Sequence, residues 1–423
     1  MPHYHAIDAE LRQLEARGLL RNPDGGEARA FAEATARQLG VCFVDASSND
    51  YLGLGRNVAW RVSRSSASLP PPPAVDTAAV PSHSSLPRSG AVSRETLDSS
   101  PDLPSTCAGS GASRLVHGSR STHAELESAL ASWVGQESAL LFTSGFAANL
   151  GVIGALAGDG DVVLSDALNH ASIIDGCRLS RAQVVKVPHL NVAELERSLS
   201  QLPHTAAKWF VTESYFSMDG DGPDLAAVEA ICRRYGAGLI VDEAHALGIF
   251  GPAGAGRCAE ARVRPDVLVG TFGKAVGTQG AFAACSPSIR SWLWNRARSF
   301  LFSTATSPVL AQISLFHVKR VQAMESERVH LEALGATLRY ALGQAGVDFG
   351  RSFGPIVPVI VGSNARALRA ASILAERGIL TQAIRSPTVP PGTERLRVTL
   401  NSALRIQDVE RLAQEISKAC RES

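Results

Sequence analysis

The sequence has 423 residues, of which 45% are hydrophobic and 19% are charged, and its formal net charge is +1. A chain of this length is longer than a domain with one hydrophobic core usually is, so we expect a large domain followed by a smaller one. The near-zero net charge argues against a protein held to nucleic acid by bulk electrostatics, and no apolar stretch reaches membrane-spanning length.

The N-terminal quarter of the chain divides into two parts of different character. The spacing of Leu11, Leu14 and Leu19 predicts a short amphipathic helix, so residues 1–60 are expected to form a helix and an arm. Residues 61–106 hold 8 of the 22 prolines and 12 serines, with no aromatic residue. This tract has too little apolar surface to offset the entropy of ordering, and we interpret it as a disordered insertion.

From residue 107 onward, apolar strands alternate with helix-like segments. Strands are predicted at 138–142, 161–166, 208–214, 238–245 and 265–272, and helices at 146–158 and 170–180. This alternation predicts an α/β fold whose mainly parallel sheet is covered by helices on both faces. We assign it to a large domain over 107–310, followed by a smaller α+β domain over 311–423.

Two charged residues follow the apolar runs of predicted strands in this sheet. Asp242 ends the apolar run Leu239–Val241, and Lys274 lies between Gly273 and Ala275 after the next strand. Each alone has an ordinary explanation, a helix cap for the aspartate and a surface turn for the lysine. Together, at the edge of a sheet where ligands gather, they favour a Schiff-base lysine and a carboxylate that pairs with a buried cation.

Three further polar features follow the same strands. The segment Thr143–Phe146 offers free backbone N–H groups at a helix start, which suits a phosphate, although a plain N-cap by Ser144 or Thr143 explains it equally well. His170 follows the second strand, and His245 lies three residues after Asp242. A lone histidine at such a position is more often structural than catalytic.

Two other motifs do not support a nucleotide site. The segment 242–245 reads DEAH, as in helicases, but no stretch fits the phosphate loop that such enzymes need. Residues 109–118 resemble a dinucleotide loop, but they follow the proline-rich tract and not a strand, and they lack the required glycine spacing.

One cofactor uses all the remaining parts. Pyridoxal 5'-phosphate has an aldehyde for a lysine, a ring nitrogen for a carboxylate, a phosphate for N–H donors and a flat ring that can stack on an imidazole. The sequence therefore predicts a site for this cofactor, built around Lys274 and Asp242.

Seven segments then resemble the α-oxoamine synthase family of fold-type I pyridoxal-phosphate enzymes. The similarity covers nearly the whole chain outside 61–106. The matching segments are SSNDYLGL (47–54), SGFAAN (144–149), NHAS (169–172), FSMDGD (216–221), VDEAHALGIFG (241–251), TFGKAVGTQGA (271–281) and AIRSPTVPPGTERLRVTL (383–400).

The resemblance implies a role for each matching residue. Lys274 would bind the cofactor aldehyde and Asp242 the ring nitrogen, while His170 would stack on the ring and His245 would bind its hydroxyl. Further cofactor contacts would come from Ser144, Gly145, Phe146, Ser217, Thr271 and, from the neighbouring subunit of a homodimer, Thr304. Asn49 and Arg397 would hold the carboxylate of the amino-acid substrate, and Arg385 and Thr388 would lie near the acyl path.

The segment 383–400 favours one reaction within the family. It implies a decarboxylative condensation of L-alanine with a pimeloyl thioester, carried by coenzyme A or by acyl carrier protein, in biotin biosynthesis. In this reaction Lys274 would serve both as covalent partner and as general base. Two alternatives stay open: a sister enzyme that condenses glycine or serine with another acyl donor, and a non-catalytic partner subunit that keeps the fold.

The tract 61–106 departs from the family pattern. An amphipathic helix is expected after residue 60, and the tract replaces it, either as a natural insertion or through a translated reading-frame error. Ala112 also stands where the family often has glycine. These departures concern the acyl side of the site more than the cofactor side.

The compartment is expected to be the cytoplasm. The N-terminus has no basic region followed by an apolar one, as a signal peptide would. The seven scattered cysteines contain no C-x-x-C spacing, which favours reduced thiols over a disulfide framework or a zinc site.

Overall fold

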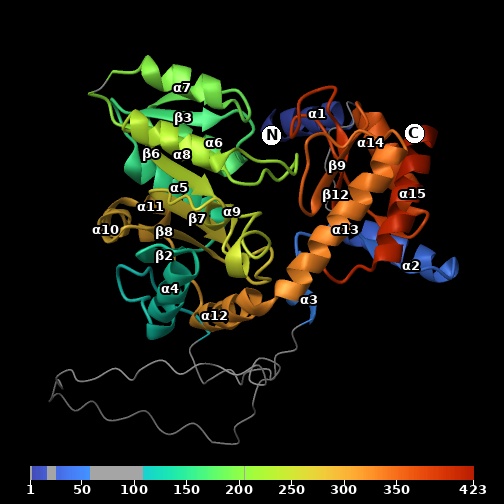
Figure 1. The fold of residues 1–423 in the computed structure, drawn as a ribbon, viewed down its shortest axis with the longest axis horizontal. Helices are drawn as coiled ribbons and strands as arrows, with labels where there is room; N and C mark the ends of the chain where they lie inside the picture. The colour runs from blue at the N-terminus through green and yellow to red at the C-terminus, as the bar shows by residue number, and fades with distance from the viewer. Residues whose placement is uncertain (1, 17–24, 58–107, 204) are drawn as a thin grey trace, which may run out of the picture.

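The computed structural model describes residues 2–16, 25–57, 108–203 and 205–423, which form two lobes (Figure 1). The predicted disordered tract at 61–106 lies outside the described residues. The domain boundaries at 60, 106 and 310 stay predictions. No helix in the described part of the chain is long and apolar enough to cross a membrane.

A seven-stranded sheet forms the first lobe, with the strand order β2-β8-β7-β6-β5-β3-β4. Strands β7, β6, β5, β3 and β4 are parallel to one another, whereas β8 is antiparallel to both β2 and β7. The mainly parallel α/β fold is therefore confirmed. The strands are β2 (Ser138–Phe142), β3 (Val162–Asp166), β4 (Gln183–Val187), β5 (Lys208–Glu213), β6 (Gly238–Asp242), β7 (Val267–Thr271) and β8 (Ala281–Cys285).

Alternating side chains of these strands feed two hydrophobic clusters, one on each face of the sheet. Val211 and Ile240 belong to one cluster, and Phe210 and Val241 to the other. The first face is covered by α5 (Gly145–Leu156), α6 (Ala171–Ser180), α10 (Pro287–Arg296) and α11 (Arg298–Leu301). The second face is covered by α4 (Ser121–Trp133), α7 (Val192–Ser200) and α8 (Leu225–Arg234). This gives the predicted three layers.

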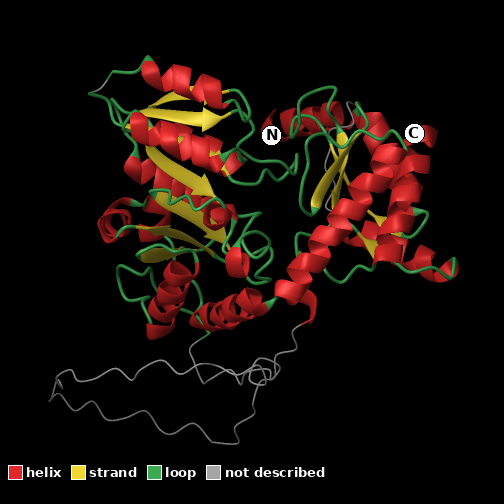
Figure 2. Cartoon of the chain, viewed as in Figure 1, coloured by secondary structure: helices red, strands yellow, loops and turns green. Residues whose placement is uncertain are grey.

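The second lobe combines C-terminal elements with part of the N-terminal segment (Figure 1), and helices lie beside its strands (Figure 2). Strands β11 (Gln382–Ile384), β12 (Arg395–Thr399) and β9 (Ile356–Ile360) form an antiparallel sheet. A second small sheet pairs β1 (Val44–Asp45) with β10 (Ile379–Leu380) in parallel. This pairing carries the N-terminal segment to the C-terminal lobe. The helices of this part are α13 (Glu325–Gln344), α14 (Asn364–Ala375) and α15 (Ile406–Glu422).

The remaining described elements connect or flank the lobes. The helix α12 (Pro308–Ala323) packs on α4 of the first lobe, and the chain then continues into α13, which packs on α15. The other elements are α1 (Pro2–Ala16), α2 (Gly25–Gln38), α3 (Leu54–Asn57), a 3-10 turn at Pro252–Gly254 and α9 (Arg257–Glu260).

The glutamate of the DEAH segment has a structural role. Glu243 is fully buried, and its carboxylate accepts hydrogen bonds from the backbone N–H groups of Arg257 and Cys258, at 3.0 and 2.6 Å. These donors are the first two residues of α9, where helical N–H groups otherwise lack partners. The carboxylate therefore fixes the start of α9, and Gly256 keeps the space beside it free.

Substituting Gly256 with alanine should destabilise the fold. Gly256 has φ +96°, and an added Cβ would lie 2.6 Å from Glu243 Oε2. Gly236 is a matched control, because it has φ +62° but nothing within 4 Å of an added Cβ. We expect G236A to lose about 1 kcal/mol of unfolding free energy from backbone strain, and G256A about 3 kcal/mol, because it adds a clash. Urea unfolding measures both, and equal losses would contradict this account.

Candidate active site

Asp242 occupies the carboxyl end of β6 and is held by two hydrogen bonds. Its side chain lies on the same face of the sheet as that of Ile240, because side chains of a strand alternate. On that face, Asp242 Oδ2 accepts from Asn149 Nδ2 of α5 at 2.7 Å, and Oδ1 accepts from the backbone N–H of Ala244 at 2.8 Å. The carboxylate is 6% exposed. It is therefore fixed in one orientation and largely removed from water.

Lys274 lies in a tight turn that follows β7. The turn is closed by hydrogen bonds from Phe272 N to Gly280 O and from Gly277 N to Lys274 O, both at 2.9 Å. Burial lowers the pKa of the Lys274 amine, while the charges of Asp242 and Glu213 oppose this shift. The predicted pair of Lys274 and Asp242 is thus brought within electrostatic range at neighbouring strand ends.

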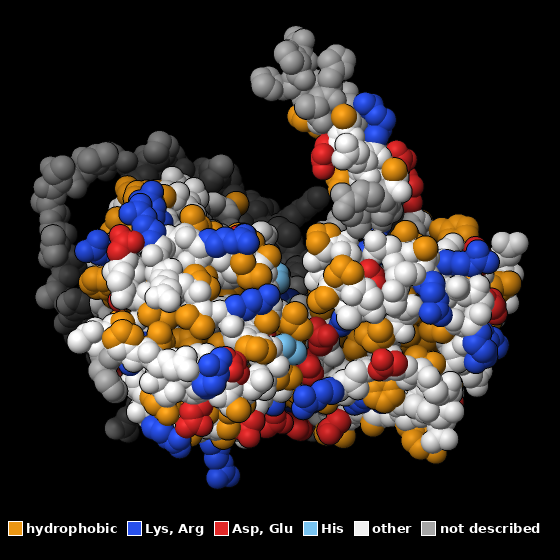
Figure 3. Space-filling view, turned by 90° about the horizontal axis from the view of Figure 1, so that it is seen from above, with side chains coloured by type: hydrophobic (Ala, Val, Ile, Leu, Met, Phe, Trp, Pro, Cys, Tyr) orange, Lys and Arg blue, Asp and Glu red, His pale blue; other side chains and the backbone are white. Residues whose placement is uncertain are grey.

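The two predicted histidines lie at this site but in different surroundings. His170 caps α6 and keeps an exposed side chain, whereas His245 is buried and bonded through Nδ1 to the Tyr51 hydroxyl at 2.8 Å. Burial lowers the pKa of the His245 imidazole, and partial burial lowers that of His170, where the charge of Asp242 opposes the shift. The positive charge of Lys274 lowers the pKa of both imidazoles further. Both rings are therefore favoured as neutral groups. Seen from above, histidine side chains are visible at the boundary between the lobes (Figure 3).

The N-terminus of α5 lies next to the end of β7. Ser144 is the N-cap of α5, and its hydroxyl accepts from the backbone N–H of Ala147 at 3.1 Å. No described residue accepts a hydrogen bond from the N–H groups of Gly145 and Phe146. A Cβ added at Gly145 would lie 3.7 Å from Thr271 Cβ. Free N–H groups at a helix start, with a glycine that leaves room, are suited to an anion.

Arg397 joins three separate segments of the chain at the other side of the site. It is 2% exposed, and its Nη1 donates to Asn49 Oδ1 at 2.9 Å and to Thr399 Oγ1 at 3.0 Å. Its Nε donates to the backbone oxygen of Ser217 at 2.5 Å. Its Nη2 has no hydrogen-bond partner within the described part of the chain. This buried, unused donor marks a place for an acceptor that the chain does not supply, such as a carboxylate.

The remaining predicted residues lie on loops. Arg385 and Thr388 belong to the loop after β11, whose Gln382 pairs with Arg397 of β12, and the backbone N–H of Thr388 donates to Arg385 O at 3.0 Å. Thr304 is exposed and lines a small cavity together with Thr143, the residue before the α5 cap. The structure brings neither Arg385 nor Thr388 into an observed contact with Lys274 or Asp242, and their roles stay predictions.

Comparison with known proteins agrees with this geometry. Residues 87–416 match the aminotransferase class I and II family. The 8-amino-7-oxononanoate synthase of Anaeromyxobacter dehalogenans is 43% identical over 401 residues, which cover 94% of this chain and 91% of that protein. The chain belongs to the aminotransferase class I and II family. The identity to 8-amino-7-oxononanoate synthase also confirms the predicted resemblance to α-oxoamine synthases.

Solved structures of the same family have the same fold. The serine palmitoyltransferase of Sphingomonas wittichii is 33% identical with a TM-score of 0.72, over 76% of this chain and 81% of that one. A second serine palmitoyltransferase, from S. paucimobilis, is 31% identical with a TM-score of 0.73, over 76% and 81% of the two chains, and contains a bound PLP–myriocin aldimine.

Two polar residues of this family site were not assigned a role from the sequence. Asn149 is 1% exposed and donates both to Asp242 and to Ser172 Oγ, at 2.7 and 2.9 Å. Glu213 ends β5 as Asp242 ends β6. Both carried a usable signal, because Asn149 is the one polar residue within the apolar stretch 146–156 and Glu213 is a charged residue shortly after the apolar run 209–211.

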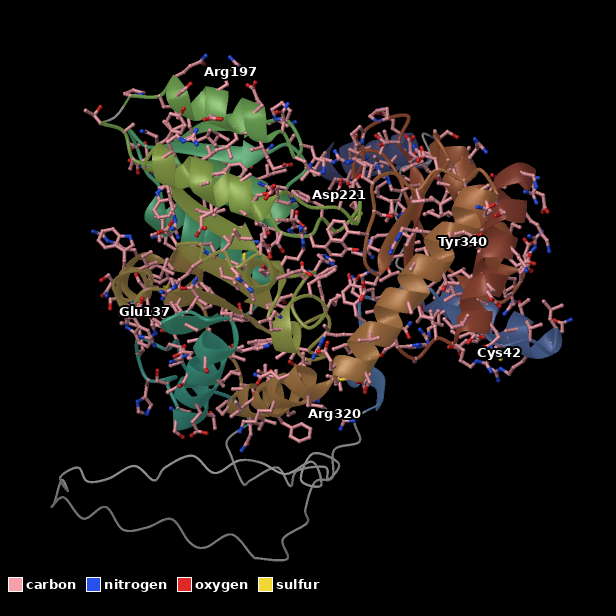
Figure 4. All side chains as sticks on the ribbon, viewed as in Figure 1. Cys42, Glu137, Arg197, Asp221, Arg320 and Tyr340 are labelled. Atoms are coloured by element: carbon pink, nitrogen blue, oxygen red, sulfur yellow. The ribbon has the colours of Figure 1, made fainter. Side chains whose placement is uncertain are left out.

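The loop over 214–221, which carries Ser217, is held by a histidine between two aspartates. His189 Nδ1 lies 2.8 Å from Asp166 Oδ1, and its Nε2 lies 3.2 Å from Asp221 Oδ1. Asp221 lies where this loop reaches towards the second lobe (Figure 4). Burial lowers the pKa of His189, but the hydrogen bonds and charges of both aspartates outweigh burial and raise it to about 10.

The His189 cation should therefore stabilise the fold in a pH-dependent way. An unfolded histidine has a pKa of about 6.5. The stabilisation is complete below that pH and is lost as the pH rises towards about 10. We expect the difference in unfolding free energy between wild type and H189N to fall by about 1.4 kcal/mol per pH unit from pH 7 to 9.

His330 provides the control for this measurement. Its Nε2 bonds to the carbonyl oxygen of Leu404 at 2.8 Å, and it forms no ion pair with any described residue. H330N removes this hydrogen bond and no ion pair, so it gives the effect of losing a histidine contact without a carboxylate partner. A pH-independent H189N difference in urea unfolding would show that His189 is not held as a cation.

Proposed function

We propose that this protein catalyses the decarboxylative condensation of L-alanine with a pimeloyl thioester, giving 8-amino-7-oxononanoate, CO2 and the free thiol carrier. The observation that carries the proposal is the convergence of Lys274 and Asp242 at the ends of β7 and β6. The substrates are inferred from relatives named 8-amino-7-oxononanoate synthase, which are 43% identical to this chain. The donor is pimeloyl-CoA or pimeloyl-acyl carrier protein.

The residues present fit pyridoxal 5'-phosphate as the cofactor. The unpartnered N–H groups of Gly145 and Phe146 would hold its phosphate, beside Thr271. Asp242 would hold the ring nitrogen, and Lys274 the aldehyde. His170 and His245 would contact the ring and its hydroxyl, and Ser217 and Thr304 would complete the cofactor site.

The chain supplies the proton transfers and the orientation of the substrates. Bound pyridoxal phosphate provides an electron sink for negative charge at the substrate Cα. The lowered pKa of Lys274 keeps a larger share of its amine neutral, as a nucleophile and a general base must be. Once released from the cofactor, this amine would remove the Cα proton of the amino acid. Asn149 keeps the Asp242 carboxylate aimed at the site throughout.

Arg397 would bind the carboxylate of the amino-acid substrate. Its Nη2 is a buried donor that no described residue satisfies, and Asn49 already orients the same guanidinium through Nη1. Arg385 and Thr388 would line the path of the acyl chain. A second candidate is condensation of glycine or serine with another acyl donor. The 31–33% identity to serine palmitoyltransferases supports the serine form of this candidate.

We further propose a cytoplasmic homodimer in which Thr304 contacts the cofactor phosphate of the other subunit. Thr304 is exposed, on a loop that also lines a cavity with Thr143. The scattered cysteines support the reducing compartment. Light scattering of the purified protein tests the dimer.

Absorption spectroscopy tests the reaction. The purified protein mixed with pyridoxal phosphate should gain a visible band that K274A lacks, because Lys274 would supply the amine that bonds to the cofactor aldehyde in this site. Adding L-alanine should shift the band more than glycine or L-serine, and adding pimeloyl-CoA should then release CO2 and form 8-amino-7-oxononanoate, detected by mass spectrometry. A shift with glycine and none with alanine would favour the second candidate.

A pair of arginine variants tests substrate binding. R397K removes the unused Nη2 donor and should raise the KM for L-alanine roughly tenfold or more, because a charge-assisted hydrogen bond is lost. Arg395 is the control on the same strand, since its Nη1 is already engaged by Asp219 Oδ1 at 2.6 Å. R395K should change that KM less than threefold. Similar effects of both variants would contradict the role of Arg397.

A further inference from the structure

A second carboxyl group lies beside Asp242, and the reaction as proposed does not use it. Glu213 ends β5, and in the parallel pairing of β5 with β6 its Cα partner is Asp242. Its side chain shares the face of Val211, as the side chain of Asp242 shares that of Ile240, so both carboxyl groups lie on the α5 side of the sheet. Glu213 is 4% exposed.

Glu213 also holds the backbone of a predicted site residue. Its Oε1 accepts a hydrogen bond from the backbone N–H of His170 at 2.7 Å. His170 is the N-cap of α6, and its Nδ1 lies 2.7 Å from Ser172 Oγ, which in turn accepts from Asn149. A chain of hydrogen bonds therefore runs from Glu213 through His170 to the residue that orients Asp242.

Three ionisable groups act on the Glu213 carboxyl group. Asp242 faces it from β6, Asp166 from the end of β3 and Lys274 from the turn after β7. Burial raises the pKa of Glu213 to about 8, with Asp242 adding to the rise and Lys274 opposing it. Two neighbouring buried carboxylates repel each other, so the proton on Glu213 leaves one negative charge on the pair.

We propose that Glu213 is a positioning residue of this site, whose carboxyl group anchors the His170 backbone. As an uncharged acid, Glu213 leaves Asp242 as the negative partner of Lys274 within the trio of Glu213, Asp242 and Lys274. The inference rests on the proposed function, because it assigns Glu213 to the cofactor site. When Glu213 ionises at alkaline pH, the Lys274 nitrogen has a second carboxylate nearby, and this added negative charge stabilises the protonated form of the nitrogen.

Glu243 is a natural comparison because it is also a fully buried carboxyl group at the end of this sheet. Its oxygens accept from Ser214 Oγ and from the backbone of Arg257 and Cys258. These bonds tie α9 to the sheet, and none of them reaches His170, Lys274 or Asp242. E243Q should therefore weaken the fold without changing the electrostatics of the site.

The test is a pH titration of the visible absorption of the bound cofactor from pH 6 to 10. The wild type and E243Q should show a spectral step near pH 8 that E213Q lacks, because the amide keeps the acceptor for His170 but cannot ionise. A purely structural Glu213 would leave this step unchanged. Identical titrations of wild type and E213Q would overturn the proposal.

Binding of pyridoxal phosphate by the apo protein gives a second readout. E213A leaves the buried N–H of His170 without an acceptor. The dissociation constant of E213A for pyridoxal phosphate should therefore rise roughly tenfold, while that of E213Q should stay within threefold of the wild-type value. Unchanged binding by E213A would overturn the anchoring role. If the wild type binds no pyridoxal phosphate, the proposed function fails. If the wild type binds it and the Glu213 variants behave like the wild type, this inference alone fails.

Discussion

The site depends on keeping one lysine and two carboxyl groups close together in a largely buried part of the molecule. A buried charge is costly unless a partner of opposite sign or several hydrogen bonds compensate it. Here Asp242, Glu213 and Lys274 come from the ends of three neighbouring strands, so the charge of Lys274 offsets part of the cost of burying the two carboxyl groups, which repel each other. The parallel sheet makes this possible, because it brings the carboxyl ends of its strands to one edge.

Buried carboxyl groups at this edge have different roles, and their hydrogen-bond partners decide which. Asp242 receives one side-chain and one backbone donor and remains aimed at the site. Glu243, the next residue, receives three donors and fixes the start of α9. Glu213 anchors the loop that carries His170. Chemistry and stability are therefore separated between adjacent positions of the same sheet edge.

The second lobe contributes the substrate side of the site through Arg397. This guanidinium binds Ser217, 180 positions away in the chain, and Asn49, 348 positions away. Asn49 reaches it because β1 pairs with β10 and ties the N-terminal segment to the C-terminal lobe. The proposed carboxylate site is thus assembled from both ends of the chain and from the loop 214–221. A relative movement of the lobes would change the position of the unused Nη2 donor directly.

By itself, the sequence determined the α/β class, the presence of the strand that carries Asp242 and of the strand that precedes Lys274, and a helix start within residues 143–146. Those predictions hold because apolar runs, turn residues and caps act locally. The sequence did not identify β4, whose residues are mostly exposed, or β8, whose run AFAAC is alanine-rich and has weak strand preference. The tertiary structure alone decided that β1 pairs with β10, that Asn149 orients Asp242 and that Glu213 neighbours it. Such pairings join residues far apart in the chain, and no local pattern specifies which distant partner a polar side chain will meet.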